Sequence, residues 1–259
     1  IYYSSFDYTL ETKRTELIGN TFNGSVNVSL SDNVSNFKLK VYGNYFGSTD
    51  KLKLNYVNNC FLHIANNYFH YTNSNTAYGC ISINYNYSNG YAEEVIIENN
   101  TFYVLIPSYN NIFNLKTINN LIVRNNYFSL HNYIPGITLS SVAIYECNNN
   151  IFSQSSFSVG SGSLSTIENN IYSATPSFST TTGVISDVSY QNTGADIPEC
   201  RDIDNTVNDV GTYGGPHSWD NYHGTSNSKA QILDLEIPYY NIILPGNQIS
   251  IKSKAVHKQ

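Results

Sequence analysis

The sequence predicts an all-β protein that folds as a parallel β-helix, a solenoid of about seven or more coils. Two observations lead to this prediction: a motif that returns with a period near 24 residues, and an alternation of apolar and polar residues inside each copy. The clearest copies are IIENNTF at residues 96–102 and IVRNNYF at residues 122–128. A unit this small cannot bury its own apolar face, so the copies must stack on one another.

Each copy aligns on one asparagine, called here the anchor. The anchors are Asn20, Asn44, Asn67, Asn100, Asn126, Asn150 and Asn170. Their separations are 24, 23, 33, 26, 24 and 20 residues, so only the fourth coil holds a long insertion. Two residues after each anchor lies an aromatic ring, namely Phe22, Phe46, Phe69, Phe102, Phe128, Phe152 and Tyr172. Three residues before each anchor lies a small or branched apolar side chain, and most positions five before it are apolar too. That period of two is typical of a strand with one buried face.

Equal coils stacked at the strand spacing of about 4.8 Å place every alignment column in a ladder. The anchors then form a ladder of amides at a turn, where asparagine tolerates a left-handed backbone and can bond the coils on either side. The rings form an internal stack. With these two features, residues 10–190 resemble the right-handed parallel β-helix proteins of the pectin-lyase-like group. The resemblance implies the fold, and it admits polysaccharide lyases and hydrolases among the possible activities.

The chain divides into three parts. Residues 1–190 are expected to form the β-helix, with an extra strand at 80–84 inside the insertion of the fourth coil. Residues 191–225 form an acidic, glycine-rich C-terminal cap, which contains the run RDIDNTVNDVGTYGGP at 201–216. This run resembles a signature that closes many secreted bacterial β-helix proteins, with Asn205 and Thr212 in place of its usual glycine and alanine. Residues 226–259 are expected to begin a β-sandwich-like module, with strands at 232–235 and 249–251.

Composition bounds the location and the partners. Only 12% of the residues are charged, the net charge is −6, and Tyr, Asn and Ser are abundant, which favours a secreted or cell-surface protein. No basic stripe is present to neutralise phosphates, so nucleic acid is not an expected partner. No apolar run is long enough to span a membrane. The four cysteines have no paired spacing, and Cys147 falls in the inward column three before an anchor. The resemblance of the cap implies export by an outer-membrane secretion machinery.

The candidate catalytic residues are Glu98 and Arg124, which share the column two before the anchor and are therefore expected side by side on the outer surface. One interpretation is an acid and a base beside a substrate groove. The other is a ladder salt bridge, which the small inventory of carboxylates in the coils favours, since a hydrolase needs two carboxylates about 5 to 10 Å apart. His63 lies in an outward column and is expected to be solvated.

Two further sets of residues are candidates for binding. Asp202, Asp204, Asn208 and Asp209 alternate like the oxygen ligands of a calcium loop, which makes calcium the candidate cofactor; the alternative is a turn held by Asx hydrogen bonds. The candidate glycan platform consists of Tyr68, Tyr85, Tyr87 and Tyr127, which are expected to point away from the inward rings. Tyrosine is also simply a good strand former, and the sequence does not decide between these two interpretations.

The leading functional hypothesis is a secreted or surface-displayed, non-catalytic scaffold, an adhesin-like or glycan-binding segment of a larger bacterial protein. Its expected partners are a polysaccharide or a surface protein. The alternative is a polysaccharide lyase or hydrolase that acts on an acidic, plant or host polysaccharide. The fold cannot decide between them, because function depends on the site.

Overall fold

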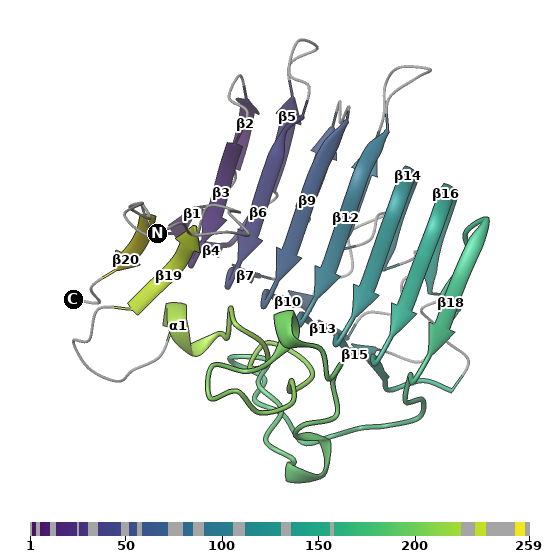
Figure 1. The fold of residues 1–259 in the computed structure, drawn as a ribbon, viewed down its shortest axis with the longest axis vertical. Helices are drawn as coiled ribbons and strands as arrows, with labels where there is room; N and C mark the ends of the chain where they lie inside the picture. The colour runs from purple at the N-terminus through teal and green to yellow at the C-terminus, as the bar shows by residue number, and fades with distance from the viewer. Residues whose placement is uncertain are drawn as a thin grey trace, which may run out of the picture.

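The computed structural model describes residues 2–3, 6–10, 14–24, 26–30, 36–47, 52–55, 59–71, 80–84, 91–105, 112–130, 136–155, 158–223, 231–236 and 252–256. Almost all of its regular structure is β, and the strands up to residue 168 pair in parallel as a β-solenoid (Figure 1). The predicted all-β architecture, a parallel β-solenoid, is therefore confirmed.

Each coil of the solenoid contributes strands to two sheets. The strands of the seven-stranded sheet are β1 (Tyr2–Tyr3), β4 (Thr21–Phe22), β7 (Tyr45–Phe46), β10 (Tyr68–Tyr71), β13 (Thr101–Val104), β15 (Tyr127–Leu130) and β17 (Ile151–Phe152). The strands of the larger sheet are β2 (Phe6–Leu10), β3 (Arg14–Ile18), β5 (Val26–Leu30), β6 (Lys38–Tyr42), β8 (Leu52–Asn55), β9 (Cys60–Ala65), β11 (Ile81–Asn84), β12 (Ala92–Glu98), β14 (Phe113–Arg124), β16 (Ile137–Asn148) and β18 (Leu164–Glu168).

The strand β11, expected as an addition to the fourth coil, is a regular part of the repeat. It pairs in parallel with β8 on one side and with the first residues of β14 on the other. The coils before it carry equivalent strands, β2 and β5, and in β14 and β16 the two strands of a coil have fused into one of 12 residues. The sequence predicted this strand in the fourth coil alone, because its alternation is short and its distance from the anchor varies from coil to coil.

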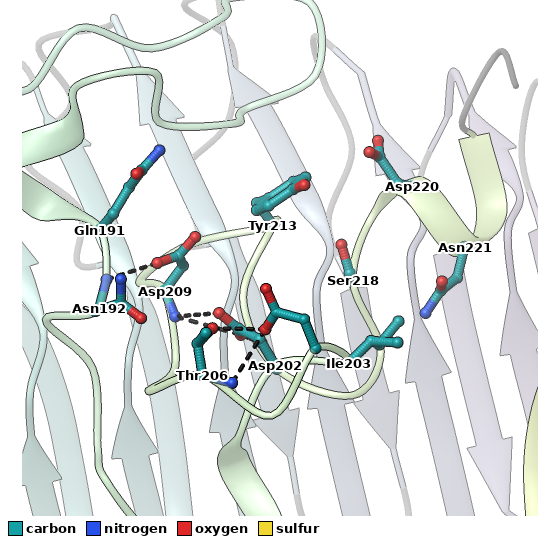
Figure 2. Close-up of a pocket in the computed structure, with 12 residues that line it drawn as sticks. Gln191, Asn192, Asp202, Ile203, Thr206, Asp209, Tyr213, Ser218, Asp220 and Asn221 are labelled. Atoms are coloured by element: carbon teal, nitrogen blue, oxygen red, sulfur yellow. Dashed lines mark hydrogen bonds between the residues drawn. The ribbon is translucent and has the colours of Figure 1, made fainter.

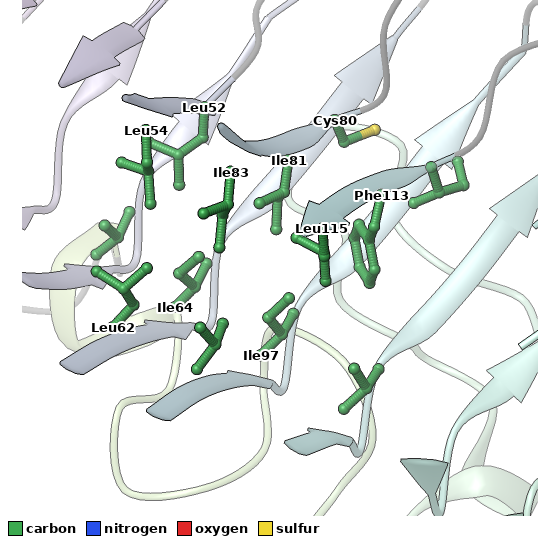
Figure 3. Packing of buried hydrophobic residues seen from close by; sticks show 14 of the residues in the cluster. Leu52, Leu54, Leu62, Ile64, Cys80, Ile81, Ile83, Ile97, Phe113 and Leu115 are labelled. Carbon is green, nitrogen blue, oxygen red and sulfur yellow. The ribbon is translucent and has the colours of Figure 1, made fainter. Parts of the chain in front are cut away.

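The register follows the alignment columns. Phe69 pairs with Phe102 and Phe102 with Phe128, while Ile97 pairs with both Ile64 and Val123. From Phe22 to Tyr172 the seven rings stack with successive centroids 4.6 to 5.2 Å apart. Leucine, isoleucine and valine side chains fill the rest of the interior (Figure 3). The packed interior includes Cys147, which is fully buried as expected, and all four cysteines are buried as free thiols.

The anchors form the predicted amide ladder. From Asn20 to Asn150, the backbone N–H and the Nδ2 of each anchor donate to the Oδ1 of the next anchor at 2.9 to 3.1 Å. The left-handed backbone, however, lies one residue earlier than expected. Its residues are Gly19, Gly43, Asn66, Asn99, Asn125, Asn149 and Asn169, with φ between 52° and 63°. Glycine and asparagine alone occupy this column because other side chains disfavour that conformation.

After β18 the chain leaves the stack and runs back along it. Residues 173–223, called here the strap, contain the short helices η1 (Val188–Tyr190), η2 (Pro198–Cys200) and α1 (Asp220–His223). The strap lies across the turns at the carboxyl ends of β9, β12, β14 and β16 (Figure 1). The strap carries the predicted C-terminal cap, but it covers this flank of the stack rather than the open side of β18. The last strand of the stack ends at Glu168, before the boundary expected at residue 190.

The remaining described residues form an antiparallel pair, β19 (Gln231–Glu236) and β20 (Lys252–Val256). The first of these contains the strand expected at 232–235, whereas residues 249–251 lie outside the described residues. A β-sandwich-like module at this end stays a prediction. No helix in the described part of the chain is long and apolar enough to cross a membrane.

Candidate functional site

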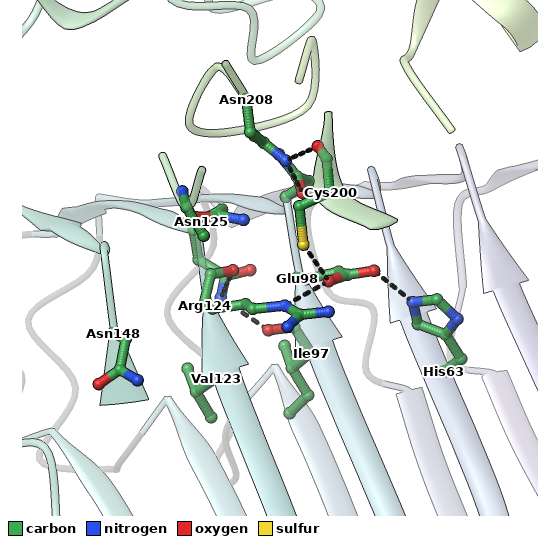
Figure 4. A network of polar contacts seen from close by, with 12 residues as sticks. His63, Ile97, Glu98, Val123, Arg124, Asn125, Asn148, Cys200 and Asn208 are labelled. Carbon is green, nitrogen blue, oxygen red and sulfur yellow. Dashed lines mark hydrogen bonds and ion pairs between the residues drawn. The ribbon is translucent and has the colours of Figure 1, made fainter. Parts of the chain in front are cut away.

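The candidate catalytic pair is buried between the stack and the strap. Glu98 pairs with Arg124 in the register of β12 and β14, as the shared column predicts, and the Nε of Arg124 donates to the Oε2 of Glu98 at 2.7 Å. The expectation that this pair lies on the outer surface is wrong. Glu98 is 6% exposed because the strap covers it, and the thiol of Cys200 lies 3.8 Å from the same Oε2 (Figure 4).

The second oxygen of Glu98 is bound as well. Its Oε1 lies 2.6 Å from the Nε2 of His63, and the Nδ1 of that ring lies 2.7 Å from the hydroxyl of Tyr42. His63 is therefore part of the network and not merely solvated, as its outward column had suggested. Burial by itself would raise the pKa of Glu98, but the hydrogen bonds and charges of His63 and Arg124 outweigh it and lower the pKa to about 2.

A carboxylate in this state is a poor acid–base catalyst. It stays ionised at every physiological pH, both its oxygens are occupied by protein groups, and the residue is buried from solvent. Burial raises the pKa of the Cys200 thiol to about 12, so that thiol remains protonated and can donate to Glu98. The network joins β9, β12 and β14 within the stack and contacts the strap through the thiol of Cys200.

The glycan platform is not formed as expected. Tyr68 and Tyr127 do point away from the inner rings, but they are 0% and 1% exposed because the strap packs on them. The hydroxyl of Tyr68 donates to the carbonyl of Thr180 at 2.7 Å, and Tyr127 belongs to a small apolar cluster with Ile185 and Val210 of the strap. Neither ring can stack on a sugar. Tyr85 and Tyr87 lie outside the described residues.

Three of the predicted calcium ligands, Asp202, Asp204 and Asp209, lie near one another in the strap, but protein groups engage the set. Asn208 is fully buried and its amide bonds Asn99 and the carbonyl of Cys200, whereas Asp204 accepts from the backbone and hydroxyl of Thr206. Asp202 accepts the N–H groups of Asp209 and Gly215. Among the described residues, no three His, Cys, Asp or Glu side chains are arranged to hold a metal ion. The alternative interpretation, a turn held by Asx hydrogen bonds, describes this loop.

The strap nevertheless forms an open pocket of about 470 Å³ from its own residues (Figure 2). The pocket is lined by Gln191, Asn192, Asp202, Ile203, Asp204, Thr206, Asp209, Tyr213, Gly215, Ser218, Asp220 and Asn221. Burial raises the pKa of Asp202 to about 6 and also raises that of Asp209. The lining therefore combines four carboxyl groups, three amides, two hydroxyl groups of Ser and Thr, and the ring of Tyr213.

Sequence reasoning missed the residues that bind the strap. The left-handed residues before the anchors direct their side chains outward: Asn66 donates to the carbonyls of Thr212 and Gly214, Asn99 donates to Asn208, and Asn125 accepts from the N–H of Ala195. The available signal was the first asparagine of each Asn–Asn pair, since a turn alone would accept glycine in that position, as it does at Gly19 and Gly43.

Comparison with known proteins adds no closer assignment. No protein-family model, no curated protein and no solved structure matches this chain. The structure itself shows a parallel β-solenoid with a strap along one flank.

Proposed function

We propose that this protein is an extracellular, non-catalytic β-solenoid scaffold of the adhesin type, which binds glycans through the pocket of the strap. One observation carries the proposal: the strap closes over Glu98 and Arg124 and, with its own residues, forms a polar pocket that contains an accessible ring. The stack provides a rigid support, and the ligand-binding groups are carried by an irregular segment fixed to it.

The chemistry of the pocket fits a sugar. Carboxylates and amides are the usual partners of sugar hydroxyl groups, and an exposed tyrosine ring offers an apolar face to the C–H groups of a pyranose. Tyr213, at 44% exposure, supplies that face, with Asp204, Asp209 and Asn192 around it. The lining includes no Lys or Arg, so its carboxylates would repel a uronic acid. Neutral and amino-bearing sugars are the ligand class that this pocket suits.

The wider setting of the proposal comes from the sequence. The asparagine ladder and ring stack resemble the pectin-lyase-like group, and residues 201–216 resemble the closing signature of secreted bacterial β-helix proteins. Both fit display on a bacterial surface after export by an outer-membrane secretion machinery. The natural partner in this setting is a polysaccharide or a glycosylated surface protein. The strap leaves the rival lyase or hydrolase activity without an accessible acid–base pair at Glu98 and Arg124.

A glycan array tests the proposal. The purified chain is screened against neutral, amino-bearing and acidic glycans, and each hit is measured by calorimetry with Tyr213→Ala and with Tyr172→Ala as the matched control. Tyr172 is similarly exposed, at 39%, but does not line the pocket. We expect Tyr213→Ala to weaken binding at least about tenfold, which corresponds to about 1.4 kcal/mol, and Tyr172→Ala to leave it unchanged.

Three results would contradict the proposal. The first is the absence of any glycan ligand, the second is equal loss of affinity in both variants, and the third is cleavage. Cleavage is followed on the same panel as new reducing or unsaturated ends. If new ends appear and are lost in Glu98→Gln, the protein is an enzyme and the buried pair becomes accessible during turnover.

A further inference from the structure

The last strand of the stack has an open edge. Within the described part of the chain β18 pairs with β16 alone, and all five of its residues, Leu164–Glu168, are exposed. It lies at one end of the row of strands in Figure 1, and the strap leaves this end uncovered as it passes along the flank. The backbone groups on the outer side of β18 are therefore available to another strand.

The side chains at this end continue columns that are buried in the rest of the stack. Ile167 is 42% exposed, whereas its equivalents Val123 and Cys147 in the preceding coils are fully buried. Ile171 and Tyr172 are 36% and 39% exposed, and Tyr172 is the end of the ring stack. The surface at this end is thus the one with which each coil packs against the next, and in the last coil it is partly exposed.

This edge lacks the features that normally prevent strands from pairing. Native edges are protected by charged side chains, proline, bulges or a covering segment. The strand at the opposite end of the larger sheet, β3, carries Arg14 and Glu16 among its five residues. In contrast, β18 has the sequence LSTIE, with serine and threonine in its middle and a single charge at its last position.

We infer that this end of the solenoid is a dimer interface, in which β18 pairs antiparallel with β18 of a second copy about a two-fold axis. With Thr166 on the axis, Ile167 lies opposite Ser165 of the second copy, and Leu164 lies opposite Glu168. No like charges face each other in this register, which is the condition for a stable cross-strand pair. A two-fold contact uses the same patch on both copies and closes on itself, so it gives a dimer and not a fibre.

Because β18 can pair with its own sequence in this register, a second copy of the chain is the partner that we infer for this edge. The interface adds a strand to the open edge of the larger sheet, antiparallel where the pairs inside the stack are parallel, and it covers Ile167. It also places the two copies end to end, so that each pocket, formed by residues 191–221 of the strap, stays open to solvent. A dimer would therefore present two equivalent pockets.

Sedimentation velocity of the full chain between roughly 1 and 100 µM, a range that spans common dissociation constants, tests the inference. We expect a concentration-dependent dimer. Thr166→Lys places two lysines opposite each other on the axis, and we expect the dissociation constant to rise at least about tenfold. Thr138→Lys is the matched control, because Thr138 is also exposed but lies in β16 outside residues 144–148, the stretch that pairs with β18.

A second variant tests the register directly. Opposite residues of an antiparallel pair have Cβ atoms about 4.5 to 5.5 Å apart, close enough for a disulfide after a small adjustment. Thr166→Cys is expected to give a covalent dimer on mild oxidation, while Thr138→Cys stays monomeric on a denaturing gel; the four native cysteines are buried. A wild-type protein that is monomeric throughout, a dimer that persists in Thr166→Lys, or an open-ended series of larger species would each overturn the inference.

Discussion

The substitution Glu98→Gln tests the buried network that lies between the stack and the strap. It keeps the shape of the side chain and removes the negative charge that pairs with Arg124 and is hydrogen-bonded to His63. The pKa of Glu98 falls from 4.5 to about 2 in the folded protein, and one pKa unit corresponds to about 1.4 kcal/mol, so ionisation contributes about 3 kcal/mol at neutral pH. Breaking one partner of a buried ion pair costs a similar amount, about 3 to 5 kcal/mol.

Urea unfolding measures this loss. Trp219, the single tryptophan, is buried in the strap, so its fluorescence reports the strap while circular dichroism reports the stack. Because the folded pKa lies below the unfolded one, the stabilisation is present above pH 4.5 and is lost as the pH falls towards 2. The variant should lack that pH dependence. Glu93→Gln is the control. The hydrogen bond that the structure shows for this carboxylate, donated by Asn119, is exposed to solvent.

The outcome that refutes this reasoning is a loss below about 1 kcal/mol, which is the value of an exposed pair. The same conclusion follows if the wild type and Glu98→Gln lose stability in parallel between pH 4.5 and 2. In either case the strap would be held by its backbone and apolar contacts, and Glu98 would be solvated when the protein is in solution.

Three further predictions concern the pocket, the ladder and the ring stack. Because the folded pKa of Asp202 is raised from 3.8 to about 6, the protein should become more stable as the pH falls through 6 towards 3.8, and Asp202→Asn should reduce this gain in thermal unfolding scans. Asn100→Ala should cost roughly 3 kcal/mol or more in urea unfolding, because it leaves several buried groups without partners, while Asn170→Ala at the end of the ladder should cost less. Phe69→Ala should lower the free energy of unfolding by about 3 to 5 kcal/mol through the cavity it leaves. Tyr172→Ala should lower it less, because that ring is partly exposed, and equal losses would contradict the continuous stack.

The coils could be predicted from sequence because their information is local and repeated. Each copy places the apolar residue, the asparagine and the ring at fixed offsets, and stacking then converts every offset into a ladder. The pairing of Glu98 with Arg124 followed from the same logic, and so did the burial of Cys147. Periodicity is sufficient wherever a residue's neighbours are its own equivalents in the adjacent coils.

The strap could not be predicted because nothing in it repeats. The burial of Glu98 depends on Cys200, which is 102 residues later in the chain, and the burial of Tyr68 depends on Thr180. Both errors about the candidate site have this one origin: positions that point outward from the coils were assumed to point into solvent. An irregular segment that satisfies its backbone through scattered asparagines and glycines carries no period from which its path could be inferred.

The path of the strap changes how the solenoid unfolds. Coils that touch only their neighbours can detach one at a time from either end. Here the ring of His223 reaches the carbonyl of Gly43 in the second coil, while the N–H of Gly211 donates to the carbonyl of Asn125 in the fifth. The strap therefore couples the second coil to the fifth, so that these coils and the strap are expected to unfold together and not one coil at a time. Since residues 173–223 follow the stacked strands in the chain and need them as a template, the strap is the step that completes folding.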